Sequence, residues 1–154
     1  MTTALDIIKA TAQQLDEPTT VVSAVGLKGL NNALDRLGWA DGVLLLYSTE
    51  QSGGIDLNLS GKARLSESVV LGFALDCKRD DEDVTAKLDQ LTALAVQFVQ
   101  RLIRQEAFTA VPSNETINPI NTQREAYEYN GQYALLTLSF NLIFDPDIET
   151  PECE

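Results

Sequence analysis

The most regular pattern of hydrophobic and polar positions lies near the end of the chain. Every second residue from 134 to 144 is hydrophobic, and three of the positions between them are polar: Thr137, Ser139 and Asn141. Because successive side chains of a strand point to opposite faces of a sheet, this alternation predicts a long strand with one buried face. The preceding Asn130-Gly131 pair is typical of a two-residue hairpin turn, which makes residues 122–129 the partner strand.

Three further strands are predicted in the first half of the chain. Residues 43–47 are all apolar, which favours a strand covered on both faces. Residues 55–59 alternate and predict a half-buried strand, and Gly53-Gly54 before them predicts a hairpin turn between these two strands. Residues 68–78 form a third run, in which Gly72 indicates a bulge or close packing against a neighbour.

The spacing of the remaining apolar residues predicts three helices. In residues 3–15 the apolar side chains share one helical face, and Thr2 or Thr3 is the expected N-terminal cap. Residues 28–37 predict a shorter helix, and residues 82–105 predict the longest one. The apolar stripe of this longest helix consists of Val84, Leu88, Leu91, Ala95, Phe98 and Leu102.

Four consecutive acidic residues, from Asp80 to Asp83, precede the longest helix. Carboxylates are favourable at a helix N-terminus, where unpaired N–H groups present partial positive charge. Oxygen ligands also suit divalent cations, but the run lacks the ligand spacing and the central glycine of a calcium loop. We expect helix capping, and the sequence leaves open whether Asp80, Asp81 and Asp83 ever bind a cation.

Together these elements predict an α+β fold, with a mostly antiparallel four- to five-stranded sheet and helices packed on one face. We expect residues 1–146 to form a single domain and residues 147–154 to be an acidic, mobile tail. Residues 19–26 favour neither helix nor strand. Residues 108–123 carry two prolines and predict a long connection that includes an exposed functional loop and room for a short strand.

Most catalytic chemistry is excluded by the residue types. Histidine is absent, which rules out Ser-His-Asp and Cys-His catalysis and histidine metal ligands. No phosphate-binding glycine motif occurs, and Cys77 and Cys153 are expected to be reduced thiols. We therefore expect no catalytic residues, no metal and no cofactor, and hence a protein that is not an enzyme. An enzyme that uses only Asp, Glu, Tyr or Lys remains an alternative.

The charge narrows the range of partners. The chain has 11 basic and 23 acidic residues and a formal net charge of −12. This balance argues against specific binding of nucleic-acid phosphates and against anionic membranes. No apolar run reaches the roughly 18 residues that a membrane helix needs, and the N-terminus lacks the pattern of a signal peptide. We expect a protein that is not secreted and does not bind membranes.

Four residues near the final hairpin form a candidate oligomer or partner interface: Arg124, Tyr127, Tyr129 and Tyr133. Tyrosine and arginine are enriched among the residues that anchor protein–protein interfaces. The alternative interpretation is that these side chains pack at the edge of the core or belong to ordinary surface.

The order of the elements resembles that of the bacteriophage tail-terminator, or tail-completion (minor tail), protein family. The resemblance extends over the whole chain. It rests on the N-terminal amphipathic helix, the strands at 42–47 and 69–77, Lys78-Arg79-Asp80 leading into the long helix from Val84, the closing strands at 117–129 and 132–144 with Arg124 and Tyr129-Asn130-Gly131-Gln132-Tyr133, and Asp145.

The resemblance implies a virion structural protein, made in the host cytoplasm and located in the phage tail. Members of this family cap the head-proximal end of the tail tube as a homo-oligomeric ring, which is expected to be a hexamer. Such a ring ends tube polymerisation and takes part in head–tail joining by contacting the connector. DNA is then only passing cargo, and no catalytic residues are implied. The alternatives are another non-enzymatic adaptor or virion protein, or an acidic DNA-mimic inhibitor.

Overall fold

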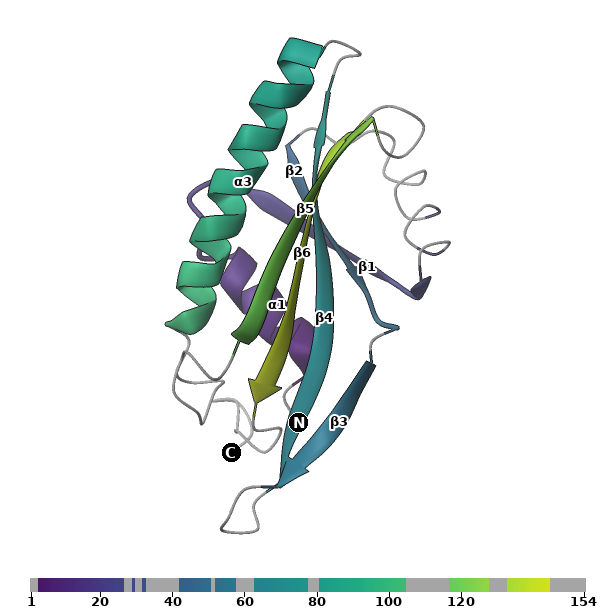
Figure 1. Ribbon diagram of the computed structural model, residues 1–154, viewed down its shortest axis with the longest axis vertical. Coiled ribbons are helices and arrows are strands. Elements are labelled where there is room, and N and C mark those ends of the chain that lie inside the picture. Colours follow the sequence, from purple (N-terminus) through teal and green to yellow (C-terminus); the bar gives the residue numbers. More distant parts are fainter. Residues whose placement is uncertain are drawn as a thin grey trace.

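The computed structural model describes residues 3–26, 29, 32, 42–50, 52–57, 63–77, 81–104, 117–127 and 133–144. Within these residues two helices and a six-stranded sheet form an α+β fold (Figure 1). In chain order the elements are α1 (Ala4–Ala12), β1 (Thr19–Ala24), β2 (Val43–Ser48), β3 (Ser52–Leu57), β4 (Ala63–Asp76), α3 (Asp81–Ile103), β5 (Ile117–Tyr127) and β6 (Tyr133–Phe144).

Within the described residues the sheet has six strands, which corrects the predicted four to five. It is mixed, because one of its pairings is parallel, but the other four are antiparallel, as expected for a mostly antiparallel sheet. Its order is β1-β2-β4-β6-β5, with β3 paired to β4. The additional strand is β1, which runs parallel to β2 with Thr19 opposite Val43. Its sequence, Thr-Thr-Val-Val-Ser-Ala, does not alternate between apolar and polar residues, so it did not predict a strand. Of its apolar side chains only Val22 is fully buried. The predicted helix at 28–37 lies, apart from residues 29 and 32, outside the described residues.

The predicted hairpin between residues 43–47 and 55–59 is wrong. Gly53 and Gly54 lie inside β3, which pairs with β4 rather than with β2. Strands β2 and β3 follow one another along the same side of β4, with Tyr47 opposite Leu71 and Ser52 opposite Ser68. This shared partner explains why β4 begins earlier than predicted.

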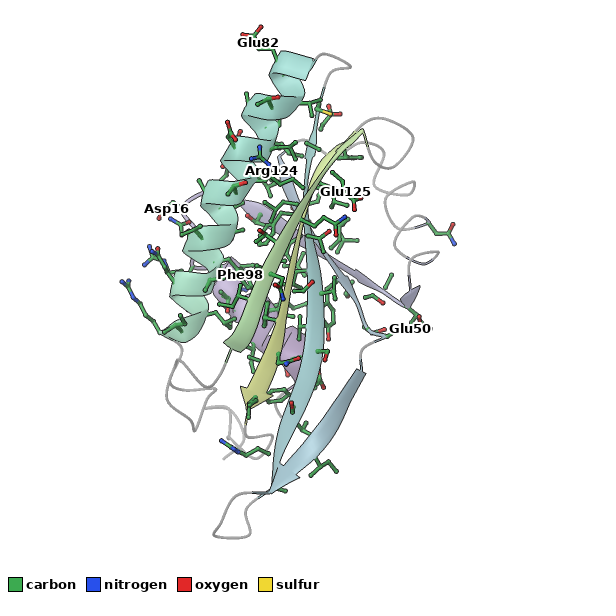
Figure 2. The ribbon with its side chains drawn as sticks, in the orientation of Figure 1. Asp16, Glu50, Glu82, Phe98, Arg124 and Glu125 are labelled. Atoms are coloured by element: carbon green, nitrogen blue, oxygen red, sulfur yellow. The ribbon has the colours of Figure 1, made fainter. Side chains whose placement is uncertain are left out.

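The main core lies between one face of the sheet and the two helices. The alternation of β6 is confirmed, because its hydrophobic residues 134, 136, 138, 140, 142 and 144 are all buried. The stripe of α3 is confirmed as well, with Leu88 partly and the other five residues fully buried. The ring of Phe98 points from α3 toward the sheet and meets Phe73 edge to face, with centroids 5.6 Å apart (Figure 2).

A smaller apolar cluster covers part of the opposite face. It consists of Val22, Leu44, Leu46, Ala74, Tyr133 and Leu135. Gly72 lies beside this cluster, and a Cβ atom there would approach Cδ1 of Leu135 to 3.1 Å. The predicted close packing at Gly72 is therefore confirmed.

Two sets of polar contacts stabilise the start of α1 and the segment that follows it. Thr3 caps the helix as predicted, since its Oγ1 accepts from the N–H of Asp6 while the Asp6 carboxylate accepts from the N–H of Thr3. After α1, the N–H of Asp16 donates to Oε1 of Gln97, whose Nε2 donates back to the Asp16 carboxylate at 2.8 Å. This reciprocal pair joins the segment after α1 to α3.

Candidate assembly interface

The four candidate interface residues do not form one surface in the described part of the chain. Arg124 is exposed on β5 and donates to Oδ1 of Asp89 on α3 at 2.8 Å (Figure 2). Tyr127 belongs to β5, but its side chain lies outside the described set, as does all of Tyr129. Tyr133 is only 1% exposed and packs in the smaller apolar cluster, so it belongs to the core of the single chain.

Strand β5 forms one edge of the sheet. Among the described strands it pairs with β6 alone. It includes residues 117–123, for which the residue pattern predicted a long connection with room for a short strand, and the resemblance implied a closing strand. Pro119 is one of the two prolines in that predicted connection. It lies where the register shifts between Ile117 and Ile120, and an edge strand tolerates a proline at such an irregularity. The rest of the expected loop, residues 108–116, lies outside the described residues.

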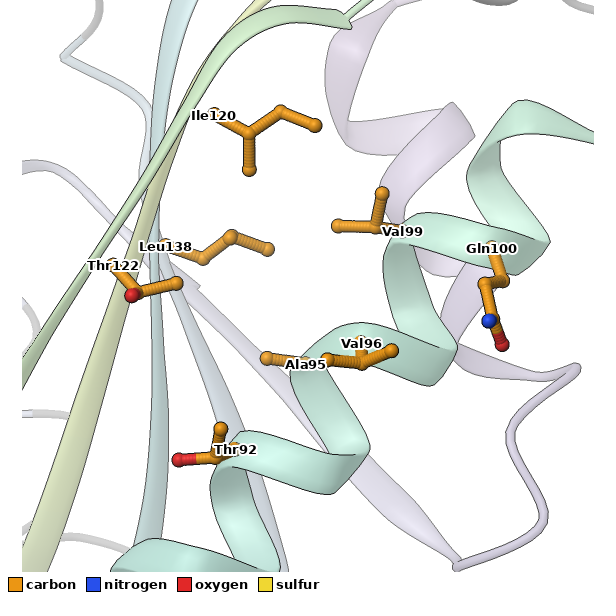
Figure 3. A pocket seen from close by; sticks show the side chains of 8 residues that line it. All are labelled: Thr92, Ala95, Val96, Val99, Gln100, Ile120, Thr122 and Leu138. Atoms are coloured by element: carbon orange, nitrogen blue, oxygen red, sulfur yellow. The ribbon is translucent and has the colours of Figure 1, made fainter.

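An apolar groove lies between β5 and α3 (Figure 3). Its volume is about 220 Å³, and Val96, Val99 and Ile120 contribute most of its larger apolar side chains. Val96 is 54% exposed and Ile120 is 43% exposed, so the groove opens to solvent. The Arg124–Asp89 ion pair bridges the same two elements. An open strand edge and an exposed apolar groove are therefore neighbours on one side of the molecule.

Sequence reasoning missed this groove. Val96 is the residue next to Ala95 in the predicted stripe of α3. Ile120 follows Pro119 in a segment that was expected to be a long connection with room for a short strand. The available signal was the pair of hydrophobic residues 117 and 120 ahead of the final hairpin, which is consistent with a strand.

A second depression contains polar groups that already bind one another. It is lined mainly by Asp16, Glu17, Gln90 and Gln97. Gln90 donates to the Glu17 carboxylate at 2.9 Å, and Gln97 is bonded to Asp16. These contacts hold the segment after α1 against α3, which makes the depression part of the scaffold.

The chemistry of the described residues centres on two groups. Cys77 is a free thiol. Burial, together with the charges of Asp83 and Asp76, raises its pKa, so the thiol is mostly protonated near neutral pH. Among the residues that the structure describes, no group of three or more His, Cys, Asp or Glu lies close enough to hold a metal ion. Asp80 and Cys153 lie outside the described residues, and so does the side chain of Asp81.

Glu67 is the second of these groups, and its ionised form lowers the stability of the fold at neutral pH. It lies on β4 opposite Leu142 of β6, so its side chain leaves the sheet on the same face as that core leucine. Burial raises the pKa of Glu67, and burial together with the Glu67 charge raises the pKa of Tyr47. Since the folded pKa exceeds the unfolded one, folding favours the protonated carboxyl. The stability gained from the protonated Glu67 carboxyl is fully present below the unfolded pKa and is lost as the pH rises through the folded pKa.

Glu67→Gln is therefore expected to raise the free energy of unfolding at pH 7 by about 0.5–1 kcal/mol, because a neutral amide avoids burying a charge. Near pH 4 the difference from the wild type should disappear. Glu125→Gln on β5 is the control and should change stability by less than about 0.5 kcal/mol at both pH values. Urea unfolding followed by circular dichroism measures both variants, and an equal or larger gain for Glu67→Gln at pH 4 would contradict this account of the site.

None of the described helices is long and apolar enough to cross a membrane. Comparison with models of known protein families found no match, and comparison with curated proteins found none either.

Proposed function

We propose that this protein is a phage tail terminator, which assembles into a ring on the head-proximal end of the tail tube and joins it to the head connector. One observation supports the proposal most: the open edge of β5 lies beside the exposed apolar groove formed with α3. Unpaired strand edges and exposed apolar grooves are both features through which chains associate. The resemblance in element order supplies the kind of assembly.

A ring requires a head-to-tail interface that closes, so each copy must present two different surfaces. The β5 side of the sheet offers one of them. On the other side of the sheet, β1 and β3 are the outer strands. Among the described strands, the outermost ones therefore lie on two opposite sides of the sheet, which is compatible with such an arrangement.

The charge fits the proposed role. A ring of chains that each carry a formal charge of −12 would repel the phosphates of DNA passing through its bore. A DNA mimic would need carboxylates in rows that copy phosphates, whereas the described groove is lined by apolar side chains and by the amide and hydroxyls of Gln100, Thr92 and Thr122. We therefore place assembly ahead of DNA mimicry.

The test is electron microscopy of the purified protein mixed with tail tubes built from the tube protein of the same genome. We expect ring-shaped particles, with single rings bound at one end of the tubes and no further tube growth at that end. An unrelated acidic protein of similar mass is the control. Tubes that stay uncapped and continue to grow at both ends in the presence of the protein would contradict the proposed function.

A further inference from the structure

The chain carries an exposed apolar side chain at the edge of the sheet that lies away from the groove. Ile55 of β3 is 74% exposed, the most exposed of its large hydrophobic residues among those the structure describes. It lies opposite Leu65 of β4, which itself lies opposite Phe144 of β6 in the main core. Because residues directly opposite one another share a face, Ile55 lies on the helix-covered face of the sheet.

The groove opens on this same face at the other edge. Ile120 of β5 lies opposite Phe140, which belongs to the main core. In the half of the sheet that contains β3, the strand order is β3-β4-β6-β5, so β3 and β5 are its two edges. Strand β1 pairs with β2 and, among the described residues, no strand pairs with the outer side of β3.

The strand directions allow one copy to continue the sheet of the next. Strand β3 is antiparallel to β4, whereas β5 is antiparallel to β6 and therefore runs in the direction of β4. A neighbouring copy in the same orientation would place its β3 antiparallel to β5. Its helices would stay on the same face, and its Ile55 would lie on the side where the groove opens.

The absence of charged side chains from the groove lining and at Ile55 makes a second copy a compatible occupant. Two chains that each carry −12 repel one another, so a contact between them must avoid further charge. Ile55 itself and the groove residues Val96, Val99 and Ile120 are uncharged. On β3, Ile55 is preceded by two glycines and followed by Asp56. The nearby charges of Arg124 and Asp89 neutralise each other. The groove volume of about 220 Å³ is large enough for one isoleucine side chain.

We propose that β3 of one copy adds to the β5 edge of the next and that its Ile55 fills the groove between β5 and α3. This inference rests on the proposed ring and names the contact that builds it. The contact is head to tail, because Ile55 and the groove are different surfaces on opposite edges of one chain.

Cysteine cross-linking tests the contact directly. In a background of Cys77→Ala and Cys153→Ala, Ile55→Cys and Ile120→Cys are made separately, and a short bis-maleimide is added to each variant and to their mixture. We expect covalent dimers in the mixture and not in either variant alone. A chain with both substitutions should yield a ladder of cross-linked oligomers whose largest member contains as many chains as the ring.

Two outcomes overturn the proposal in distinguishable ways. If rings form but the mixture gives no more cross-link than the separate variants, the contact is wrong and the ring function stands. If no variant and no wild-type protein associates, with or without tail tubes, both the contact and the ring function are wrong.

A charge placed in the groove provides the second measurement. Val96→Glu should weaken association at least about tenfold, because it buries a carboxylate in the contact. The matched control is Val70→Glu, since Val70 is similarly exposed at 48% but lies on the opposite face, across from Ser139. Circular dichroism checks that both variants fold. Equal association by the two variants would overturn the proposal.

Discussion

Phe98→Ala is expected to lower the free energy of unfolding by about 3–5 kcal/mol. The side chain of Phe98 is fully buried in α3 and packs against Phe73 of β4 at 5.6 Å and an interplanar angle of 73°. Removing it leaves a cavity where the helix meets the middle of the sheet and also deletes an edge-to-face aromatic contact. A domain of this size has only about 5–15 kcal/mol of stability, so this one substitution would remove a large part of it.

Val96→Ala is the matched control for this experiment, because Val96 lies two residues earlier in the same helix and is exposed. It should change stability by less than about 0.5 kcal/mol. Urea unfolding followed by circular dichroism gives both values. Similar losses for the two variants would mean that α3 does not pack on the sheet through the face that contains Phe98.

Gly53→Ala is expected to lower the free energy of unfolding by about 2–3 kcal/mol, although both glycine and alanine fit an extended strand. A Cβ atom at Gly53 would lie 2.7 Å from the carbonyl oxygen of Ser66 and 3.2 Å from Cγ of Glu67. The nearer of these atoms is backbone, so it moves only if the pairing of β3 with β4 is disturbed.

Gly54→Ala provides a control at the adjacent position, since no atom lies within 4 Å of a Cβ there. That variant should be unchanged or more stable by about 0.4–1 kcal/mol, because alanine restricts the unfolded chain. Thermal unfolding compares the two variants, and hydrogen exchange shows whether β3 alone is released. Equal losses at both positions would show that the strand requires glycine for backbone conformation and not for space.

The elements that alternation and helical spacing define were predictable. The buried face of β6, the stripe of α3 and the cap at Thr3 each depend on residues close together in the sequence, and each is confirmed. Strand pairing was less accessible. Gly53-Gly54 was interpreted as a turn because glycine is common in turns, whereas Gly53 is required by the close approach of β4.

The candidate interface was predictable only in part. The sequence drew attention to Arg124, which does lie on the edge strand and contacts α3. It also pointed to Tyr133, whose burial depends on packing against Val22, Leu44 and Leu46 from distant parts of the chain. The groove arises where α3 crosses β5, and such a meeting of two elements leaves no pattern within either one.

Self-assembly of the chain is the central claim, and the mass of the protein in solution tests it most directly. Light scattering coupled to gel filtration, repeated over increasing concentration and with tail tubes added, separates single chains from closed rings. We expect a discrete species of about six times the chain mass of 16.8 kDa, favoured at high concentration or on the tubes. A constant mass of 16.8 kDa under all these conditions, with no protein bound to the tubes, would contradict the claim.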